Sequence, residues 1–310
     1  MSVLTIQPAF NDQMAEVNHY PVMHRQILES LDLQNRKVVV DCTVGAGALA
    51  QKVLSQMSPE ALFVGMDKDE DTFELVRKRL GKAEERIQLF KADFTDLDKV
   101  LEDLDIKEVD TFIFDLGIST PQLSNPERGF SFLKDGPLDM RMDKNAFVSA
   151  YDLVNNLSER ELANIFRKFG EERHYRKVAN FLVRARKNKP IATTAELTNI
   201  ITDAIGTRYR DLKIHPATRV FQSLRIAVNR ELTALEEGLK KAIPFLSAGA
   251  RIAVISFHSL EDRIVKHTFR DYAQEDILKI ITKKPLLPDD EEIRENPASR
   301  SAKLRIAEKI

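Results

Sequence analysis

The 310-residue chain is 43% hydrophobic and 31% charged, proportions typical of a globular protein with a core, and these exclude a disordered chain. Its formal net charge is −1, and its single cysteine excludes an internal disulfide. No apolar run approaches the ~18 residues of a membrane span, and residues 1–18 lack the pattern of a signal peptide. We therefore expect a cytoplasmic protein with no membrane partner. The lack of a Cys/His cluster predicts no metal site.

The first half of the chain alternates predicted strands with predicted helices. After a helix that ends near Leu33, we interpret four apolar segments as strands, at residues 37–41, 61–67, 87–91 and 109–115. The helix capped by Asp69 is expected to bury four apolar side chains, Phe73, Leu75, Val76 and Leu80. This alternation predicts a parallel, doubly wound α/β sheet. Ligands of such sheets bind at the carboxyl ends of the strands, where four acids lie, Asp41, Asp67, Asp93 and Asp115.

The second half of the chain departs from this alternation. The apolar side chains of residues 116–143 predict an ordered active-site segment. Helices are expected at 159–169, 173–187 and 194–205, two of them opened by capping boxes, Ser158 with Glu161 and Thr193 with Glu196. A single long helix is then expected from Pro216 to about Ile243. A fifth parallel strand is expected at 250–256. An antiparallel pair at 278–282 and 303–307, with a long surface loop at 283–300 between its strands, should complete the sheet.

A glycine-containing turn follows the first strand. Gly45 and Gly47 allow a sharp turn and a close approach of the backbone to a ligand, and the helix from Ala48 directs free N–H groups towards it. The spacing Gly45-x-Gly47-x-x-Ala50 fits a dinucleotide site as well as a methyl-donor site. Asp67 could accept both hydroxyls of a ribose. Phe94, with the preceding acid, either lies beside an adenine or forms a core contact.

Asp115 begins a turn of a different kind. It ends an apolar strand and precedes a Gly/Ser/Pro turn that includes Ser119 and Pro121, the position at which enzymes that methylate exocyclic amines hold the amine. Acceptors on the amine N–H bonds align the nitrogen with the methyl group, and positioning supplies most of the rate. A hydrolase triad of His258, Ser259 and either Glu261 or Asp262 is disfavoured, because residues on one turn rarely face each other and no Gly-x-Ser-x-Gly elbow is present.

The net charge conceals a basic middle segment. Residues 160–230 hold 16 Lys and Arg against 6 Asp and Glu. Such a surplus indicates a surface that binds a polyanion, although solvated helix faces can have the same composition. Four arginines in this segment could line a phosphate track, Arg173, Arg176, Arg184 and Arg186.

Several long motifs resemble the bacterial 16S ribosomal RNA cytosine-N4 methyltransferase family, known as MraW or RsmH. The early motifs are HYPV at 19–22, DCTVGAG at 41–47 and DLGISTPQL at 115–123. The middle ones are ERGFSF at 127–132, DGPLDMRMD at 135–143 and FGEER at 169–173. The last ones are HPATR at 215–219, ISFHSLEDR at 255–263 and Asn296-Pro297. Together they cover nearly the whole chain from His19.

This resemblance implies S-adenosylmethionine (SAM) as methyl donor and N4 of a cytidine in the decoding centre of 16S rRNA, within the 30S subunit, as acceptor. It implies a Rossmann-like class I methyltransferase domain at 19–125 and 216–310, with an inserted helical RNA-recognition domain at 126–215. The implied donor contacts are Gly45, Gly47, Ala48, Leu49, Asp67, Phe94, Asp115 and Gln122. The expected catalytic residues are Asp115, Ser119, Pro121 and His258. Arg141 and Arg219 join the four arginines above as expected RNA contacts.

The glycine loop departs from the family pattern. The family loop usually reads Gly-x-Gly-Gly-His-Ser, whereas here Ala48 adds a methyl group and Leu49 removes a polar side chain. Two alternatives therefore stay open, an RNA-binding paralogue with weakened catalysis and, on the loop spacing alone, a nicotinamide oxidoreductase. The sequence leaves the oligomeric state open, with a homodimer as one option.

Overall fold

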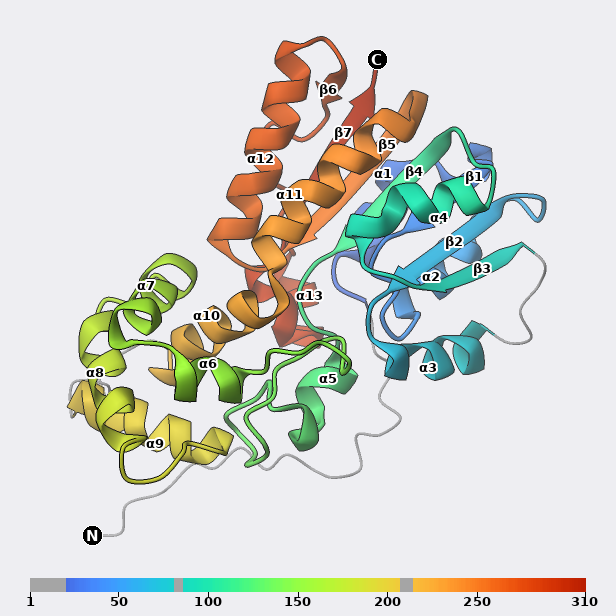
Figure 1. Cartoon of the computed structure of the whole chain (residues 1–310). Coiled ribbons are helices and arrows are strands. Elements are labelled where there is room, and N and C mark those ends of the chain that lie inside the picture. Colours follow the sequence, from blue (N-terminus) through green and yellow to red (C-terminus); the bar gives the residue numbers. More distant parts are fainter. Residues whose placement is uncertain (1–20, 81–85, 207–213) are drawn as a thin grey trace, which may run out of the picture.

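Seven strands form one sheet in the order β3-β2-β1-β4-β5-β7-β6 in the computed structural model, which describes residues 21–80, 86–206 and 214–310 (Figure 1). The strands are β1 Val38–Asp41, β2 Leu62–Asp67, β3 Ile87–Lys91, β4 Val109–Asp115, β5 Leu246–Ser256, β6 Leu278–Ile280 and β7 Lys303–Lys309. The first five are parallel, and β7 pairs antiparallel with both β5 and β6. This is the Rossmann-like sheet that the sequence predicts, although β5 begins earlier than expected.

Helices cover both faces of the sheet, because successive strand side chains point to opposite sides. Val39 and Ile113 pack in one core with α1 His24–Leu31, α2 Ala48–Leu54 and α3 Glu70–Leu80. Val40 and Phe112 pack in the other with α4 Leu97–Asp103, α11 Glu231–Ala242 and α12 Ser259–Gln274. In α3, Phe73 and Val76 are buried as predicted, and Leu80 packs partly buried against the first core. Leu75 is 41% exposed, so its predicted burial is wrong.

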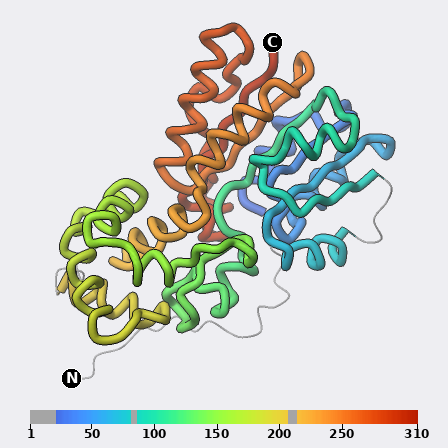
Figure 2. Tube along the Cα trace, viewed as in Figure 1, coloured from blue at the N-terminus to red at the C-terminus, as the bar shows by residue number. Residues whose placement is uncertain are grey.

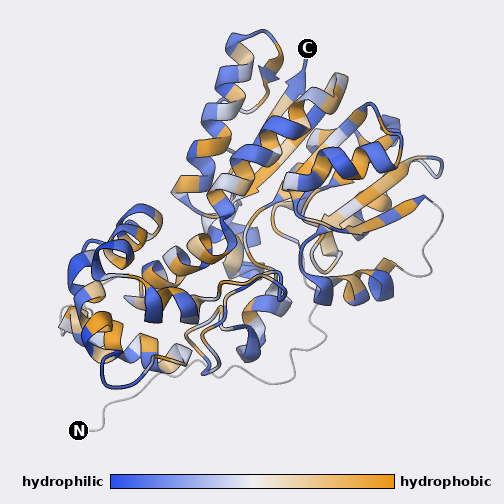
Figure 3. Ribbon diagram, viewed as in Figure 1, coloured by the Kyte–Doolittle hydropathy of each residue, from blue (hydrophilic) through white to orange (hydrophobic). Residues whose placement is uncertain are grey.

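A third core lies among the helices that interrupt the sheet, and these helices stand apart from it at the lower left of Figures 1 and 2. They are α6 Ala150–Asn156, α7 Glu159–Gly170, α8 Tyr175–Ala185, α9 Thr194–Ile205 and α10 Ala217–Asn229, whereas the short α5 Thr120–Ser124 contributes no residue to this core. The apolar faces of these helices point inward in Figure 3. Both predicted capping boxes are formed, at the starts of α7 and α9. We call this body the helical unit.

The prediction of one long helix from Pro216 to Ile243 is wrong, because the helix is interrupted at Arg230. This residue has φ 51°, in the left-handed region, and separates α10 from α11. The two halves serve different cores: Leu224 of α10 lies in the core of the helical unit, and Leu235 of α11 lies against the sheet. Apolar periodicity continues across the break because both helices are amphipathic, so the sequence pattern does not reveal it.

The two irregular segments are more ordered than a simple loop. Residues 116–143 hold α5 and a 3-10 turn, and four of their apolar side chains are buried in the helical unit, Phe130, Leu138, Met140 and Met142. The predicted surface loop 283–300 contains α13 Asp290–Glu295, whose Glu291 pairs with Arg25 of α1. No helix within the described part of the chain has the length and apolar character needed to cross a bilayer.

The break at Arg230 yields a stability prediction. We expect Arg230→Gly to have a free energy of unfolding about 1 kcal/mol higher than Arg230→Ala, because glycine adopts positive φ without a Cβ clash. Urea denaturation of the two variants measures the difference. The exposed Glu237, inside α11, is the matched control, and there the Gly variant should be the less stable one. Equal stability of the two Arg230 variants would contradict the prediction.

Candidate functional site

A cavity of about 780 Å³ opens at the carboxyl ends of the parallel strands, where the strand order reverses between β1 and β4. Its volume suits a site that encloses a small molecule, for which ~300–1,000 Å³ is usual. It brings together most of the predicted site residues: Gly45, Ala48, Leu49, Asp67, Phe94, Asp115, Ser119, Pro121 and Gln122. Gly47 and His258 do not line it.

The glycine loop is held against the end of β2. Gly45 and Gly47 have φ values of 50° and 77°, which explains why both positions carry glycine. The Gly45 N–H donates to Asp67 Oδ2 at 2.9 Å, and a Cβ on Gly47 would lie 3.4 Å from Val76. Leu49 is 5% exposed and packs in the core beneath the loop. The departure at Leu49 is therefore accommodated by apolar packing, which a polar histidine would not provide in the same way.

Asp67 also accepts a hydrogen bond from the Asp69 N–H, at 2.8 Å to Oδ1. Burial raises its pKa to about 6, against the opposing effect of the Asp69 and Gly45 N–H groups. Each carboxylate oxygen keeps a second lone pair, so Asp67 can still accept hydroxyl groups of a ligand in the cavity. The predicted ribose acceptor therefore has the position and the acceptor capacity that this role needs.

Two carboxylates lie close together at the ends of β1 and β4, the buried Asp41 and the cavity-lining Asp115. Burial, with the nearby Asp41 and Glu261 carboxylates, raises the pKa of Asp115 to about 8. Burial also raises the pKa of Asp41 to about 7. The Thr43 hydroxyl accepts from the Asp115 N–H at 2.6 Å and lies 3.5 Å from Asp41 Oδ1, which ties the ends of β4 and β1 together. The sequence marked Asp41 only as a strand-end acid, and nothing in its spacing reveals this pairing.

Both acids keep one oxygen without a hydrogen-bond partner in the described structure, Oδ2 of Asp41 and Oδ1 of Asp115. Buried acceptors of this kind cost free energy unless a donor or a cation reaches them. S-adenosylmethionine carries a sulfonium and an ammonium group, so its positive charge would stabilise the ionised form of these acids. These carboxylates therefore fit a cationic ligand better than an anionic one.

Both the oxygen and the nitrogen of the Gln122 side chain form hydrogen bonds within the protein. Its Oε1 accepts from the Ser119 N–H at 2.9 Å, completing the capping box of α5, and its Nε2 donates to Asp69 Oδ2 at 2.6 Å. Arg128 donates to the same Asp69 oxygen at 2.7 Å, and both partners are almost fully buried. Sequence reasoning missed Asp69 and Arg128 as site-shaping residues, because an ion pair 59 residues apart in the chain leaves no local signal.

Phe94 makes the core contact that was one of its two predicted roles, and its ring also faces the cavity. Its ring meets Phe114 edge-on at 5.6 Å between centroids, and it also lines the cavity. A Cβ on Gly238 of α11 would lie 2.6 Å from Phe94 Cδ2, so this glycine makes room for the ring. Asp93 caps the following turn through the Thr95 N–H and pairs with Lys68 at 3.2 Å.

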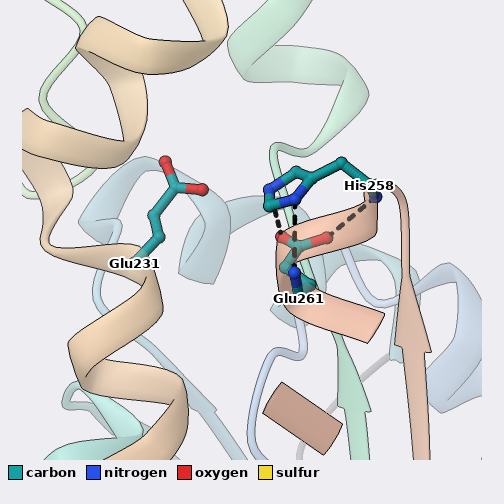
Figure 4. A group of neighbouring side chains, drawn as sticks. All are labelled: Glu231, His258 and Glu261. Atoms are coloured by element: carbon teal, nitrogen blue, oxygen red, sulfur yellow. Dashed lines mark hydrogen bonds and ion pairs between the residues drawn. The ribbon is translucent and has the colours of Figure 1, made fainter. Parts of the chain in front are cut away.

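Glu231, His258 and Glu261 meet beside the cavity, which Glu231 and Glu261 line (Figure 4). His258 caps α12, with Nδ1 accepting from the Glu261 N–H at 3.3 Å. Its Nε2 lies 3.2 Å from Glu261 Oε1 without hydrogen-bond geometry. Burial alone would raise the pKa of Glu261, but the His258 ring, Arg225 and the Phe257 N–H hold it below its usual value.

These three side chains offer ligand atoms within 4.8 Å of one another, a spacing that a divalent cation could bridge. Arg225, however, donates from Nε and Nη2 to the two oxygens of Glu231, at 2.9 and 2.8 Å. Because Nδ1 of His258 accepts a backbone proton, the ring proton resides on Nε2, which leaves that nitrogen without a free lone pair. The cluster is thus held by two separate sets of hydrogen bonds, Arg225 with Glu231 between α10 and α11, and His258 with Glu261 at the start of α12.

The arginines predicted to bind RNA do not converge on the cavity, and none of them lines it. Arg141 is paired with Asp139 at 2.7 Å, and Arg186 donates to the carbonyls that end α6. Arg219 donates to the Glu171 carbonyl at 3.1 Å. Arg173, Arg176 and Arg184 are exposed on or just before α8. These three are the members of the set whose exposure suits contact with a polyanion.

The raised pKa of Asp115 predicts a pH-dependent stability. The unfolded carboxyl, with a pKa of 3.8, loses its proton before the folded one, so stability falls as pH rises from about 4 to 8. Asp115→Asn removes this loss. We expect its melting temperature to exceed that of the unmodified protein by at least ~2 °C at pH 8.5, with a smaller or reversed difference at pH 5. Exposed Asp103→Asn is the control, and equal shifts at the two pH values would contradict the prediction.

Comparison with known proteins places the chain in a family. A sequence profile described as the MraW methylase family matches residues 16–310. Ribosomal RNA small subunit methyltransferase H of Halothermothrix orenii is 44% identical over 309 residues, covering 95% of this chain and 99% of that protein. Proteins of the same name from a Sulfurihydrogenibium species and Geobacter sulfurreducens are 49% and 46% identical, covering 95% and 94% of this chain and 100% and 99% of theirs. The chain belongs to the MraW methylase family and is an S-adenosylmethionine-dependent methyltransferase.

Proposed function

We propose that this protein methylates the exocyclic N4 of a cytidine in the decoding centre of 16S rRNA, acting on the 30S ribosomal subunit. The shared name of its relatives, an rRNA small subunit methyltransferase, supports the ribosomal substrate. The observation that carries the proposal is a single cavity that joins the glycine loop to the turn after Asp115. Such a cavity can hold a donor and an acceptor base within reach of each other.

The glycine loop and Asp67 hold the donor in this proposal. S-adenosylmethionine supplies an electrophilic methyl group on its sulfonium, and the amine gives up one proton in exchange for that methyl. The loop between Gly45 and Leu49 contacts the donor through its backbone, so the methyl group of Ala48 is tolerated if the main chain keeps its distance. Asp67 accepts the ribose hydroxyls, Phe94 packs beside the adenine, and Gln122 braces the wall through Asp69.

Asp115 and the turn from Ser119 to Pro121 hold the acceptor amine. Asp115, Ser119 and Pro121 all line the cavity, and the unpartnered Oδ1 of Asp115 supplies an acceptor for an amine N–H. A cation beside Asp115 favours its carboxylate form, which is the better acceptor. Alignment of the nitrogen with the methyl group then supplies the catalysis, and no strong base is needed before attack. His258 acts through Glu261, which it orients from the cap of α12.

The helical unit recognises RNA in this proposal. We assign residues 19–125 and 216–310 to the catalytic domain and 126–215 to RNA recognition. Arg219 holds the residues just before Arg173 through the Glu171 carbonyl, and Arg141 holds the turn at Ala146. Although α10 lies within 216–310, it packs in the core of the helical unit, for example through Leu224. Residues 19 and 20 lie outside the described residues. A homodimer stays a possibility that the chain leaves open.

A weakened, RNA-binding paralogue is the alternative. It is motivated by Ala48 and Leu49 in the glycine loop, whereas the packing of Leu49 in the core argues that the loop remains intact. The nicotinamide oxidoreductase is set aside, because the chain belongs to a methylase family.

The proposed function is tested by methyl transfer. The protein is incubated with labelled S-adenosylmethionine and 30S subunits from cells that lack this modification, and the modified nucleosides are mapped. We expect one N4-methylcytidine in the decoding centre of 16S rRNA. Tight subunit binding without label transfer would support the paralogue instead. Label at another base or site would refute the assigned target.

Asp67→Asn tests the donor site. We expect its Kd for S-adenosylmethionine to rise at least ~10-fold, because a hydrogen bond to a charged acceptor is lost from each ribose hydroxyl. Isothermal titration calorimetry measures the change, and Asp103→Asn serves as the exposed control. An unchanged Kd in Asp67→Asn would remove Asp67 from the donor site.

A further inference from the structure

The side chain of Phe147 is exposed to solvent, although the backbone on either side of it is fixed by hydrogen bonds. Its side chain is 99% exposed, and it belongs to none of the three cores. Val148 and Tyr151 beside it are 45% and 38% exposed. A single exposed aromatic is common on protein surfaces, so its exposure alone carries no function. Its support and its position are the informative features.

The support of Phe147 is rigid on both sides. Before it, the Ala146 N–H donates to the Asp143 carbonyl at 3.0 Å, and Arg141 Nη1 donates to the Ala146 carbonyl at 2.8 Å. Arg141 is itself fixed by its pair with Asp139. After it, Ser149 forms a capping box at the start of α6. The ring is therefore held out from the surface by its backbone, and little ordering entropy is lost when a ligand packs on it.

The position of Phe147 is next to the site. Ala146 and Asp143 line a second cavity of about 370 Å³, and this cavity shares Lys68, Ala92 and Asp93 with the main one. A strand of nucleic acid with one base in the main cavity would thus pass its neighbouring nucleotide along the second cavity towards Phe147. The wall of the second cavity carries balanced charges, Lys68, Lys91 and Arg230 against Asp93, Asp96 and Asp143. Because these charges balance, the wall of the second cavity does not attract a phosphate group by charge alone. A nucleotide beside it would need a contact of another kind.

We propose that Phe147 is a stacking platform for the base of a nucleotide next to the methylated cytidine. The proposal rests on the proposed function, because it requires a single-stranded RNA segment at the site. Unstacked RNA bases pack on exposed aromatic rings, and loss of one such contact weakens binding about 5- to 100-fold. The ring is sequence-tolerant, so it holds the flanking base without reading its identity.

The kinetic test compares variants at this position. Phe147→Ala should raise KM for undermethylated 30S subunits at least ~5-fold and leave the Kd for S-adenosylmethionine unchanged. Phe147→Tyr, which keeps the ring, should retain the original KM, and Phe147→Leu, which keeps only apolar area, should not. Ile310→Ala, also exposed but at the far end of β7, is the control. An unchanged KM in Phe147→Ala, or a Leu variant equal to the Tyr variant, would overturn the proposal.

A binding measurement keeps this test separate from catalysis. The chain contains no tryptophan, so Phe147→Trp would be the sole indole of the protein. We expect its fluorescence to be quenched by an RNA fragment that spans the target cytidine, and Ile310→Trp to be unaffected. If RNA quenches the fluorescence of Phe147→Trp but the protein transfers no methyl group, the proposed function is refuted and the stacking contact is supported. A spectral change that depends on protein concentration without RNA would instead identify a second copy of the chain as the occupant and overturn the proposal.

Discussion

The buried ion pair between Asp69 and Arg128 is the contact on which the architecture of the site depends. Arg128 uses Nη1 for Asp69 and Asp71 and Nη2 for the carbonyls of Arg141 and Met142, so both guanidinium amines have partners in a place almost without water. Loss of one partner from such a pair costs about 3–5 kcal/mol, because it leaves a buried charge uncompensated. This single side chain joins the start of α3 to the segment that leads into the helical unit.

The site lies where two separately packed bodies meet. The sheet supplies the glycine loop and the strand-end acids, and the break at Arg230 lets α11 return to the sheet from the helical unit. The same break puts Glu231 at the start of α11, where it pairs with Arg225 of α10 and faces His258. The wall of the cavity therefore depends on both bodies.

Carboxylates give the cavity its chemical character. Asp41, Asp67 and Asp115 end neighbouring strands, and burial raises the pKa of each. The sheet concentrates them because parallel strands present their carboxyl ends at one edge. Their mutual repulsion and lost hydration cost stability in the free protein, and a cationic ligand in the cavity would lower that cost for Asp67 and Asp115, which line it.

The sequence alone determined the alternation of strands and helices in the first half of the chain, the two capping boxes at Ser158 and Thr193, the glycine turn and the acids at the strand ends. These features are local: a strand-end acid or a Ser-x-x-Glu box is stabilised by neighbours in the chain, so its pattern can be read there. The tertiary structure alone decided the break at Arg230, the burial of Asp41 beside Asp115, the Asp69–Arg128 pair and the meeting of Glu231 with His258. Each of these depends on groups far apart in the chain or on which core a helix joins. Amphipathic periodicity shows that a helix buries one face, but it cannot show against what.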